Sequence, residues 1–479
     1  MEDILRKGLE LAQQLGASYA DIRVTRRDTE RISVRNGGVE SLNRGGNEGF
    51  GVRVLKDGAW GFAATPIMQE GDLERKLART TQRAIEVAQA AARVNRTPVE
   101  LAPEEPVRAR VATPLKLDPF ELPLEKKIQD LTDITAALRS QPEIRVGSAA
   151  LRLFRDTKTF ASSEGAYIEQ TITQTGFNTM ALAVGNGRAE RRTYSDHGTG
   201  GYELVQQLDP LGKAPQVARE AVQLLTAENC PVGENTLILG GNQVALQLHE
   251  SCGHPTELDR ALGSEATYAG TSFLMPDMLG KFRYGSPEVN INMDATIPQG
   301  LGTFFYDDEG VQAQNTPIIQ QGIFSNYLTS RDTALQFGQR SNGTMLADGW
   351  ENFPLVRMTN ISLQPGDWTL EEIIRDTKRG VMMDGQKSWS LDDKRVNFHF
   401  GCEIGWEIAD GEIKRVLRNV AYTDLTPHFW NGCDAVANRD YWRCWGLPSC
   451  AKGEPVQIAN VGHGAAPARF RKIRVGVEA

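Results

Sequence analysis

Residues 235–254 read NTLILGGNQVALQLHESCGH. The run at 235–239 is typical of a buried strand, and the apolar residues that follow favour a buried helix carrying His249. The segment ends in the pattern HExxxH, formed by His249, Glu250 and His254. Two imidazoles can bind a divalent metal ion, and a carboxylate next to the first can act as general base. The stretch therefore predicts a strand–helix unit that presents a metallohydrolase site.

The spacing of the two histidines is unusual for a helical metal site. The common helical signature places its histidines four residues apart, on one face of the helix. His249 and His254 are five residues apart, which is about 140° around a regular α-helix. A π-turn would return both rings to one face, and a helix that loosens at Gly253 before Pro255 would have a similar effect. We therefore expect a bulged or kinked helix at this point.

Composition places the chain among ordinary globular proteins. Its 479 residues are enough for two or three domains, each with its own core. A formal net charge of −8 argues against non-specific nucleic-acid binding as the main role. The sequence shows no membrane span or signal peptide, and its six cysteines lack the pattern of a disulfide framework. These features predict a cytoplasmic protein.

Element order predicts an α+β fold with two parts. Residues 1–230 form an N-terminal α/β region with helices expected at 2–15, 72–93, 124–138 and 214–226. Its segments 1–106 and 107–230 are either two copies of one helix–strand unit or two unrelated α/β segments. A Pro-rich stretch at 97–106 indicates a linker between them. Residues 231–479 predict a domain rich in antiparallel strands, which carries the metal helix.

A catalytic zinc site normally has a third protein ligand. His197, His399 and His428 lie in a glycine-rich turn, a strand pattern and an aromatic loop, which favours structural roles for them. Cys450 is the more interesting residue, because a loop cysteine near Lys452 can present a thiolate. From local context alone, an ordinary buried cysteine remains the favoured interpretation of Cys450.

An ordered set of segments in the C-terminal half resembles the TldD subunit of the TldD/TldE (PmbA) metalloproteases. The matching segments are HESCGHPTELD at 249–259, DDEG at 307–310, 322–327, RMTN at 357–360 and CAKGEPVQIANVGHGAAP at 450–467. Residues 1–230 match more loosely, through their early helix–strand pattern and an expected loop at 191–201. The resemblance also implies an α/β N-terminal region and a strand-rich C-terminal domain.

The resemblance implies a zinc ion bound by His249, His254 and Cys450, with Glu250 as general base. It implies cleavage of unfolded peptides, such as leader peptides and antitoxins, inside a closed two-subunit cavity. The partner would be a TldE/PmbA-like subunit or a second copy of the chain, with no role for nucleic acid or membrane.

The chain departs from the family pattern at three places. Ala451 replaces a glycine, residues 388–392 replace a glycine-rich stretch, and His463 stands where a glutamine is usual. These departures bear on substrate preference more than on metal binding. His463 is a candidate substrate-binding donor or a loop histidine, and Asp308 and Glu309 either line the site or form a turn.

Three other functions fit part of the pattern. A metal-dependent amidohydrolase for small substrates would use the same residues. A non-catalytic TldE-like partner subunit would not need the HExxxH motif, so the presence of the motif argues against this function. A nucleic-acid regulator would need a basic patch, which the sequence does not show.

Overall fold

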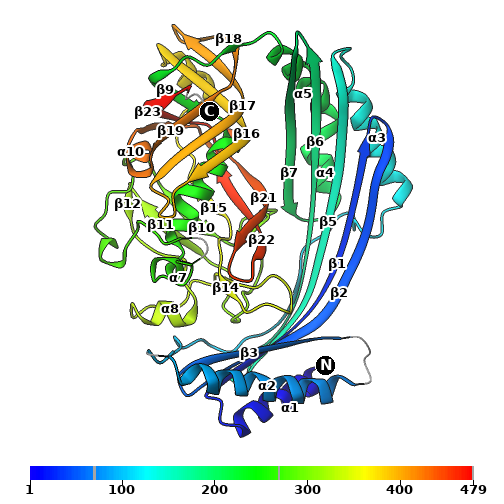
Figure 1. The fold of residues 1–479 in the computed structure, drawn as a ribbon, viewed down its shortest axis with the longest axis vertical. Helices are drawn as coiled ribbons and strands as arrows, with labels where there is room; N and C mark the ends of the chain where they lie inside the picture. The colour runs from blue at the N-terminus through cyan, green and yellow to red at the C-terminus, as the bar shows by residue number, and fades with distance from the viewer. Residues whose placement is uncertain (68–71, 96, 268–269, 477–479) are drawn as a thin grey trace.

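The computed structural model describes residues 1–67, 72–95, 97–267 and 270–476. The fold is mixed α+β, as the sequence predicts. Long strands of the N-terminal region bend from one end of the molecule to the other, and the C-terminal region lies along the inner side of the bend (Figure 1). In the described part of the chain, no helix is long and apolar enough to cross a membrane.

The N-terminal region is built on one seven-stranded sheet with the order β3-β2-β1-β5-β6-β4, to which β7 adds beside β6. Its strands are β1 Tyr19–Arg35, β2 Gly38–Lys56, β3 Ala59–Pro66, β4 Arg108–Ala112, β5 Ile144–Ser162, β6 Tyr167–Gly185 and β7 Arg188–Thr199. Its helices are α1 Glu2–Gln14, α2 Leu73–Ala92, α3 Leu124–Leu138, α4 Glu203–Leu208 and α5 Pro210–Leu224.

The two expected segments share this sheet. Each contains a helix, three antiparallel strands and a closing helix, so the repeated element order is present. The strands that follow the opening helices α1 and α3 of the two segments, β1 and β5, pair along their length from Asp21↔Ser162 to Arg35↔Ser148. The segments 1–106 and 107–230 therefore lie in one continuous sheet.

Two hydrophobic clusters form on this sheet. The helices α1 and α2 pack on one end of the long strands, where β1 contributes Ile22 and Val24. The helices α3 and α5 pack on the other end, where β1 contributes Ile32 and Val34. One strand of 17 residues therefore joins both clusters, which makes the region a single unit.

Several strand boundaries differ from the sequence-based expectation. The strands β1 and β6 are each continuous, whereas the apolar runs in their sequence, at 19–25 and 31–35 and at 166–175 and 179–184, indicate two shorter strands each. Polar residues occupy the middle of both strands without breaking the ladder. The expected loop at 191–201 is mostly the strand β7. Its turn, Asn186-Gly187, has positive φ at both positions, as the tight hairpin turns at Asn36-Gly37 and Asp57-Gly58 also do.

The C-terminal region contains an eight-stranded antiparallel-rich sheet. The strand β16 pairs with both β9 and β17, which closes β16, β9, β23, β19 and β17 into a ring. The sheet strands are β8 Glu228–Asn229, β9 Gly233–Leu239, β16 Arg379–Leu391, β17 Asn397–Ala409, β18 Glu412–Arg418, β19 Ala421–Leu425, β20 Cys433–Val436 and β23 Ala468–Val475. The expected C-terminal domain extends to residues 477–479, which lie outside the described residues.

Shorter elements complete this region. The small strands are β10 Ile291–Asp294, β11 Asn315–Gln320, β12 Ile323–Phe324, β13 Met345–Leu346, β14 Leu355–Val356, β15 Ile361–Leu363, β21 Arg443–Lys452 and β22 Gln457–Ala465. The helices are α6 Gly241–Leu248, α7 Leu258–Ala261, α8 Arg331–Leu335, α9 Leu370–Arg375 and α10 Thr426–Asn431. The helix α9 is shorter than the sequence pattern indicates, because Arg379 already begins β16.

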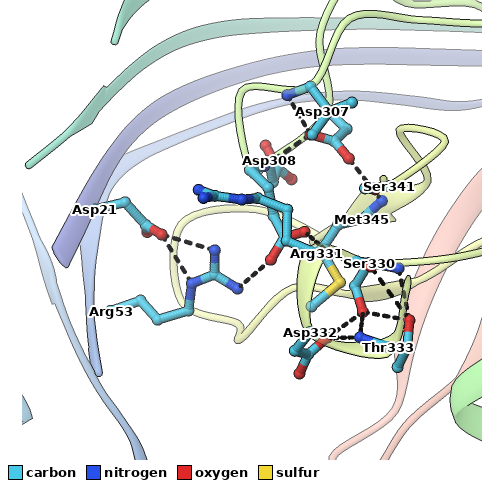
Figure 2. Close-up of polar contacts among 12 residues, drawn as sticks. Asp21, Arg53, Asp307, Asp308, Ser330, Arg331, Asp332, Thr333, Ser341 and Met345 are labelled. Atoms are coloured by element: carbon cyan, nitrogen blue, oxygen red, sulfur yellow. Dashed lines mark hydrogen bonds and ion pairs between the residues drawn. The ribbon is translucent and has the colours of Figure 1, made fainter. Parts of the chain in front are cut away.

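Buried ion pairs connect the two regions at residues 307–310 (Figure 2). Arg53 of β2 contacts Asp21 of β1 at 2.7 Å and Glu309 at 3.1 Å. Asp308 contacts Arg23 at 3.3 Å and also pairs with Lys158. Asp308 and Glu309 lie in a turn, and both carboxylates bind the N-terminal sheet.

The expected linker at 97–106 is also attached to the C-terminal region. It has no helix or strand, but Ala102 N–H donates to the Arg331 carbonyl at 2.9 Å, and Arg331 Nε donates to the Ala102 carbonyl at 2.8 Å. Arg331 further pairs with Glu164 at 2.7 Å. The stretch therefore lies fixed against the C-terminal region.

We expect Arg53→Met to lower the free energy of unfolding by about 3–5 kcal/mol, because Asp21 and Glu309 would remain buried without their cation. Arg83→Met is the matched control, since Arg83 and Glu86 form an exposed pair worth less than about 1 kcal/mol. Urea denaturation followed by tryptophan fluorescence measures both values. Equal values for the two variants would contradict a connecting role for Arg53.

Candidate metal centre

The expected bulge in the histidine helix is present. The helix α6 runs into a π-helical turn at His249–Gly253, and the His254 N–H donates to the His249 carbonyl five residues earlier. A short 3-10 turn follows at His254–Thr256. The two imidazole rings lie 4.8 Å apart between centroids. The π-turn therefore brings two histidines that are five residues apart onto the same face of the helix.

The turn's carbonyl groups find partners in nearby hydroxyls. Tyr284 Oη donates to the Ser251 carbonyl at 2.8 Å. Thr256 Oγ1 lies 2.8 Å from the Cys252 carbonyl and 2.9 Å from the Gly253 carbonyl. Buried backbone carbonyls need such partners, since leaving one unpaired costs about 1–3 kcal/mol. These hydroxyls therefore stabilise the departure from a regular α-helix.

Packing accounts for the residues inside the motif. Ser251 Oγ accepts a hydrogen bond from Trp430 Nε1 at 2.9 Å and donates to the Gln247 carbonyl at 2.6 Å. A Cβ at Gly253 would lie 1.9 Å from Met358 Sδ, so only glycine fits there. Ser251 and Gly253 thus anchor the turn from the side away from the histidines.

His249, His254 and Cys450 form a buried group whose ligand atoms all lie within 4.8 Å of one another. Cys450 Sγ is 3.8 Å from His254 Nε2. Cys450 lies in the strand β21, just after an irregularity in its pairing with β22, and not in the expected tight loop. The neighbouring Ala451 is part of the same strand and exposed, so an alanine is accommodated where the family pattern has glycine.

His463 fixes the orientation of His249 from behind. Its Nε2 lies 2.8 Å from His249 Nδ1, and its Nδ1 lies 3.2 Å from the Ile361 carbonyl. A carbonyl only accepts, so His463 Nδ1 carries the proton and its Nε2 accepts the Nδ1 proton of His249. These two hydrogen bonds leave the Nε2 lone pair of His249 available to a metal. Both nitrogens of His463 are engaged inside the protein, unlike those of a substrate-facing donor.

Glu257 has the corresponding position behind His254. Its Oε2 is 3.1 Å from His254 Nδ1, 3.2 Å from Arg260 Nε and 3.5 Å from Lys452 Nζ. Burial alone would raise the pKa of Glu257, but Lys452, His254 and Arg260 hold it well below the ordinary value. A charged Glu257 accepts the Nδ1 proton of His254. The Nε2 of His254 then faces Cys450. Asp259, the next carboxylate along the chain, instead binds Lys452 at 2.8 Å.

The protonation states of the three candidate ligands suit a divalent metal. Burial lowers the pKa values of His249 and His254, which favours neutral imidazoles. Burial raises the pKa of the Cys450 thiol, but His254 and Arg357 lower it by more than burial raises it. The pKa of Cys450 is therefore below its ordinary value. Arg357, and not the expected Lys452, is the cation that faces this cysteine. Two neutral imidazoles and a low-pKa thiol are an established zinc donor set.

Glu250 follows His249 in the π-turn and faces a cation from another segment. Arg395 Nη1, in the turn between β16 and β17, lies 3.5 Å from Glu250 Oε2. The Glu250 side chain is 9% exposed, so water reaches it. The arrangement provides a carboxylate beside the donor group, as general-base chemistry requires.

The remaining histidines lie outside the group. His197 is buried at the end of β7, where burial and Arg152 lower its pKa to about 3. His399 belongs to β17, and His428 pairs with Asp424 on the surface. Sequence reasoning missed Arg357 and Arg395, because neither cation lies near the motif in the sequence. The RMTN segment contained Arg357, but no local signal assigned it a role.

A buried His–His–Cys group with an adjacent carboxylate has the chemistry of a metal-dependent hydrolase. Three models described as PmbA/TldA metallopeptidase match the chain in order: domain 1 over 20–88, the central domain over 117–227 and the C-terminal domain over 233–476. The chain belongs to this family, the PmbA/TldD metallopeptidases, and the resemblance noted in its sequence is confirmed.

Individual relatives span nearly the whole chain. A metalloprotease of Methanocaldococcus jannaschii is 30% identical over 93% of this chain and 94% of its own length. A protein of Saccharolobus solfataricus named zinc metalloprotease TldD homolog is 24% identical over 98% and 99%. The crystal structure of TldE from Thermococcus kodakarensis shares the fold, with a TM-score of 0.76 at 17% identity and full coverage of both chains.

We expect His463→Ala to weaken Zn²⁺ binding by about 10–100-fold, because His249 would lose the acceptor that orients its ring. His463→Gln should lose less, since an amide can both accept and donate. His428→Ala is the control, because that histidine is exposed on α10. Competition with a chelator of known affinity measures the three values. Equal affinities would show that His463 does not orient His249.

Proposed function

We propose that the chain is a zinc-dependent peptidase that cleaves unfolded peptides. The observation that carries this proposal is the convergence of His249, His254 and Cys450 through the π-turn, with Glu250 beside them. The name of the S. solfataricus relative supports zinc as the metal. Family membership favours a peptide substrate over the small-molecule amidohydrolase and the non-catalytic partner.

In this proposal, each residue has a defined task. His249 and His254 hold the metal through Nε2, and Cys450 holds it through Sγ. A zinc ion bound there supplies Lewis acidity toward water and the peptide carbonyl. Glu250 takes a proton from the attacking water and returns it to the leaving amine as the carbon–nitrogen bond breaks. His463 and Glu257 keep the two imidazoles in the tautomers that this requires.

Backbone pairing is the proposed mode of substrate capture. Cys450 lies on β21, whose described residues form a two-stranded sheet with β22 alone. An extended peptide can add to such an edge through main-chain hydrogen bonds, with little dependence on its side chains. Only an unfolded segment offers a free backbone, which accounts for the proposed substrate class, including leader peptides and antitoxins.

The proposed assembly is a two-subunit particle in the cytoplasm. The shared fold with a TldE structure supports a TldE/PmbA-like partner, and a second copy of this chain is the other arrangement. A cavity enclosed by two subunits would exclude folded proteins from the site. We propose no nucleic-acid or membrane partner.

We expect Glu250→Gln to keep about one zinc per chain and to reduce kcat by about 10²–10⁴-fold, because the general base is lost. Cys450→Ala should lose most of its zinc. Cys444→Ala, on the same strand, should keep both zinc and activity. Elemental analysis and cleavage of a fluorogenic peptide measure these outcomes. Full activity in Glu250→Gln would refute its role, and zinc in Cys450→Ala would show that the third ligand is another residue.

We also expect a strong preference for unfolded substrates. One small disulfide-bonded protein can be offered in native form and after reduction and alkylation, which keeps its sequence constant. Cleavage should be confined to the alkylated form, as followed by mass spectrometry. Equal rates on both forms would contradict capture through backbone pairing, and hydrolysis of short amides alone would favour the amidohydrolase function.

A further inference from the structure

The turn between β16 and β17 holds Arg395 in a fixed position. The Asp392 carboxylate accepts hydrogen bonds from the backbone N–H groups of Lys394, Val396 and Asn397 at 2.8, 3.3 and 2.5 Å. Arg395 N–H donates to the Asp392 carbonyl at 2.9 Å, and Thr426 Oγ1 donates to the Arg395 carbonyl at 2.8 Å. The turn therefore has little freedom to move away.

Arg395 also has a strained backbone. Its φ of +66° lies in the left-handed region, which non-glycine residues rarely adopt. Such strain costs about 1–3 kcal/mol, and it persists where the surroundings hold it in place, often at functional sites. Here the hydrogen bonds of Asp392 and Thr426 provide that support.

The guanidinium of Arg395 has donor capacity to spare beside Glu250. Its Nη1 lies 3.5 Å from Glu250 Oε2, longer than the 2.7–2.9 Å or so of a strong charge-assisted hydrogen bond. Its Nε is buried and has no hydrogen-bond partner in the described part of the chain. An arginine carries five N–H donors and stays charged at any relevant pH. A second acceptor next to Glu250 would give the Arg395 guanidinium a further hydrogen-bond partner.

We propose that Arg395 is a catalytic residue that donates hydrogen bonds to the carbonyl oxygen of the scissile peptide bond. This inference rests on the proposed peptidase function. Water activated by Glu250 attacks the carbonyl carbon, so the carbonyl oxygen must lie close to that carboxylate. Negative charge grows on this oxygen as the new carbon–oxygen bond forms. Arg395 transfers no proton, since the proton moves from water through Glu250 to the leaving amine.

A fixed donor suits this task better than a mobile one. A donor whose backbone is held by its turn needs less reorganisation when charge develops, and sites with little water strengthen such interactions. In the free enzyme, the same guanidinium compensates the charge of Glu250. The acceptor that arrives with the substrate would then satisfy the unpartnered Nε.

We expect Arg395→Gln to reduce kcat by about 100-fold with a small change in KM, because a transition-state donor contributes mainly to kcat. Arg395→Lys should fall between this variant and the wild type. Lys394→Gln is the matched control: it removes a positive charge from the same turn, but its side chain is exposed. Zinc content and thermal melting should match the wild type in all three variants.

A binding measurement separates catalysis from folding and positioning. A phosphinic peptide carries a charged oxygen in place of the developing oxyanion, so Arg395→Gln should bind it about 100-fold more weakly. The uncleaved substrate peptide should bind the Glu250→Gln variant and the Glu250→Gln/Arg395→Gln double variant within about threefold of each other. Isothermal titration calorimetry measures both.

Several results would overturn this inference. They are wild-type kcat in Arg395→Gln, a loss confined to KM, and equal affinity of Arg395→Gln and wild type for the phosphinic peptide. Loss of zinc in Arg395→Gln would likewise assign the residue to the metal site instead of the oxyanion. Failure of the proposed function is a different result, since zinc-loaded wild-type protein would then cleave no peptide.

Discussion

The hydrogen bond from the His254 N–H to the His249 carbonyl spans five residues and determines the geometry of the centre. A regular helix would direct the two imidazoles about 140° apart. The longer turn brings them together and leaves backbone carbonyls that need new partners. Tyr284 and Thr256 meet that need, and Trp430 holds Ser251 from the core. Much of the packing around the motif therefore serves one local change in the backbone.

The fold brings the other parts of the centre from distant segments. Cys450 and His463 come from the ribbon β21–β22, Arg395 comes from a hairpin turn, and Glu257 follows the histidine helix directly. The ring strand β16 and the separate ribbon β21–β22 both pack against α6. Each imidazole then has one nitrogen fixed by a protein acceptor and one left for a metal. These acceptors orient both rings, which reduces the cost of ordering the ligands around a metal.

Local patterns predicted the parts of the structure that local physics controls. The α1 and α3 helices follow from apolar periodicity, and the bulge at 249–253 follows from the five-residue spacing of two histidines expected to share a metal. The hairpin turn at Asn186-Gly187 and the strand β7 that follows it were missed, although Asn-Gly is a common sequence for such turns. The length of β1 was also missed, because its polar middle is stabilised by pairing with two neighbours.

Long-range contacts set the limit of prediction for the candidate site. The motif indicated His249, Glu250 and His254, whereas Cys450 needed the family resemblance to become more than a buried cysteine. The roles of Glu257 and His463 depend on which ring nitrogen each one meets, and a sequence does not encode that directly. The same holds for Asp308 and Glu309, whose partners Arg23, Arg53 and Lys158 lie more than 100 residues away.

The π-turn also constrains how such a site can change over evolutionary time. Deleting one residue between the histidines would restore the four-residue spacing of the common helical signature. It would also displace Ser251 from Trp430 and break the hydrogen bonds that Tyr284 and Thr256 donate to the carbonyls of the turn. A lineage could not cross between the two spacings through a single indel without disturbing the core. The length of this motif is therefore protected by hydroxyl groups that never touch the metal site.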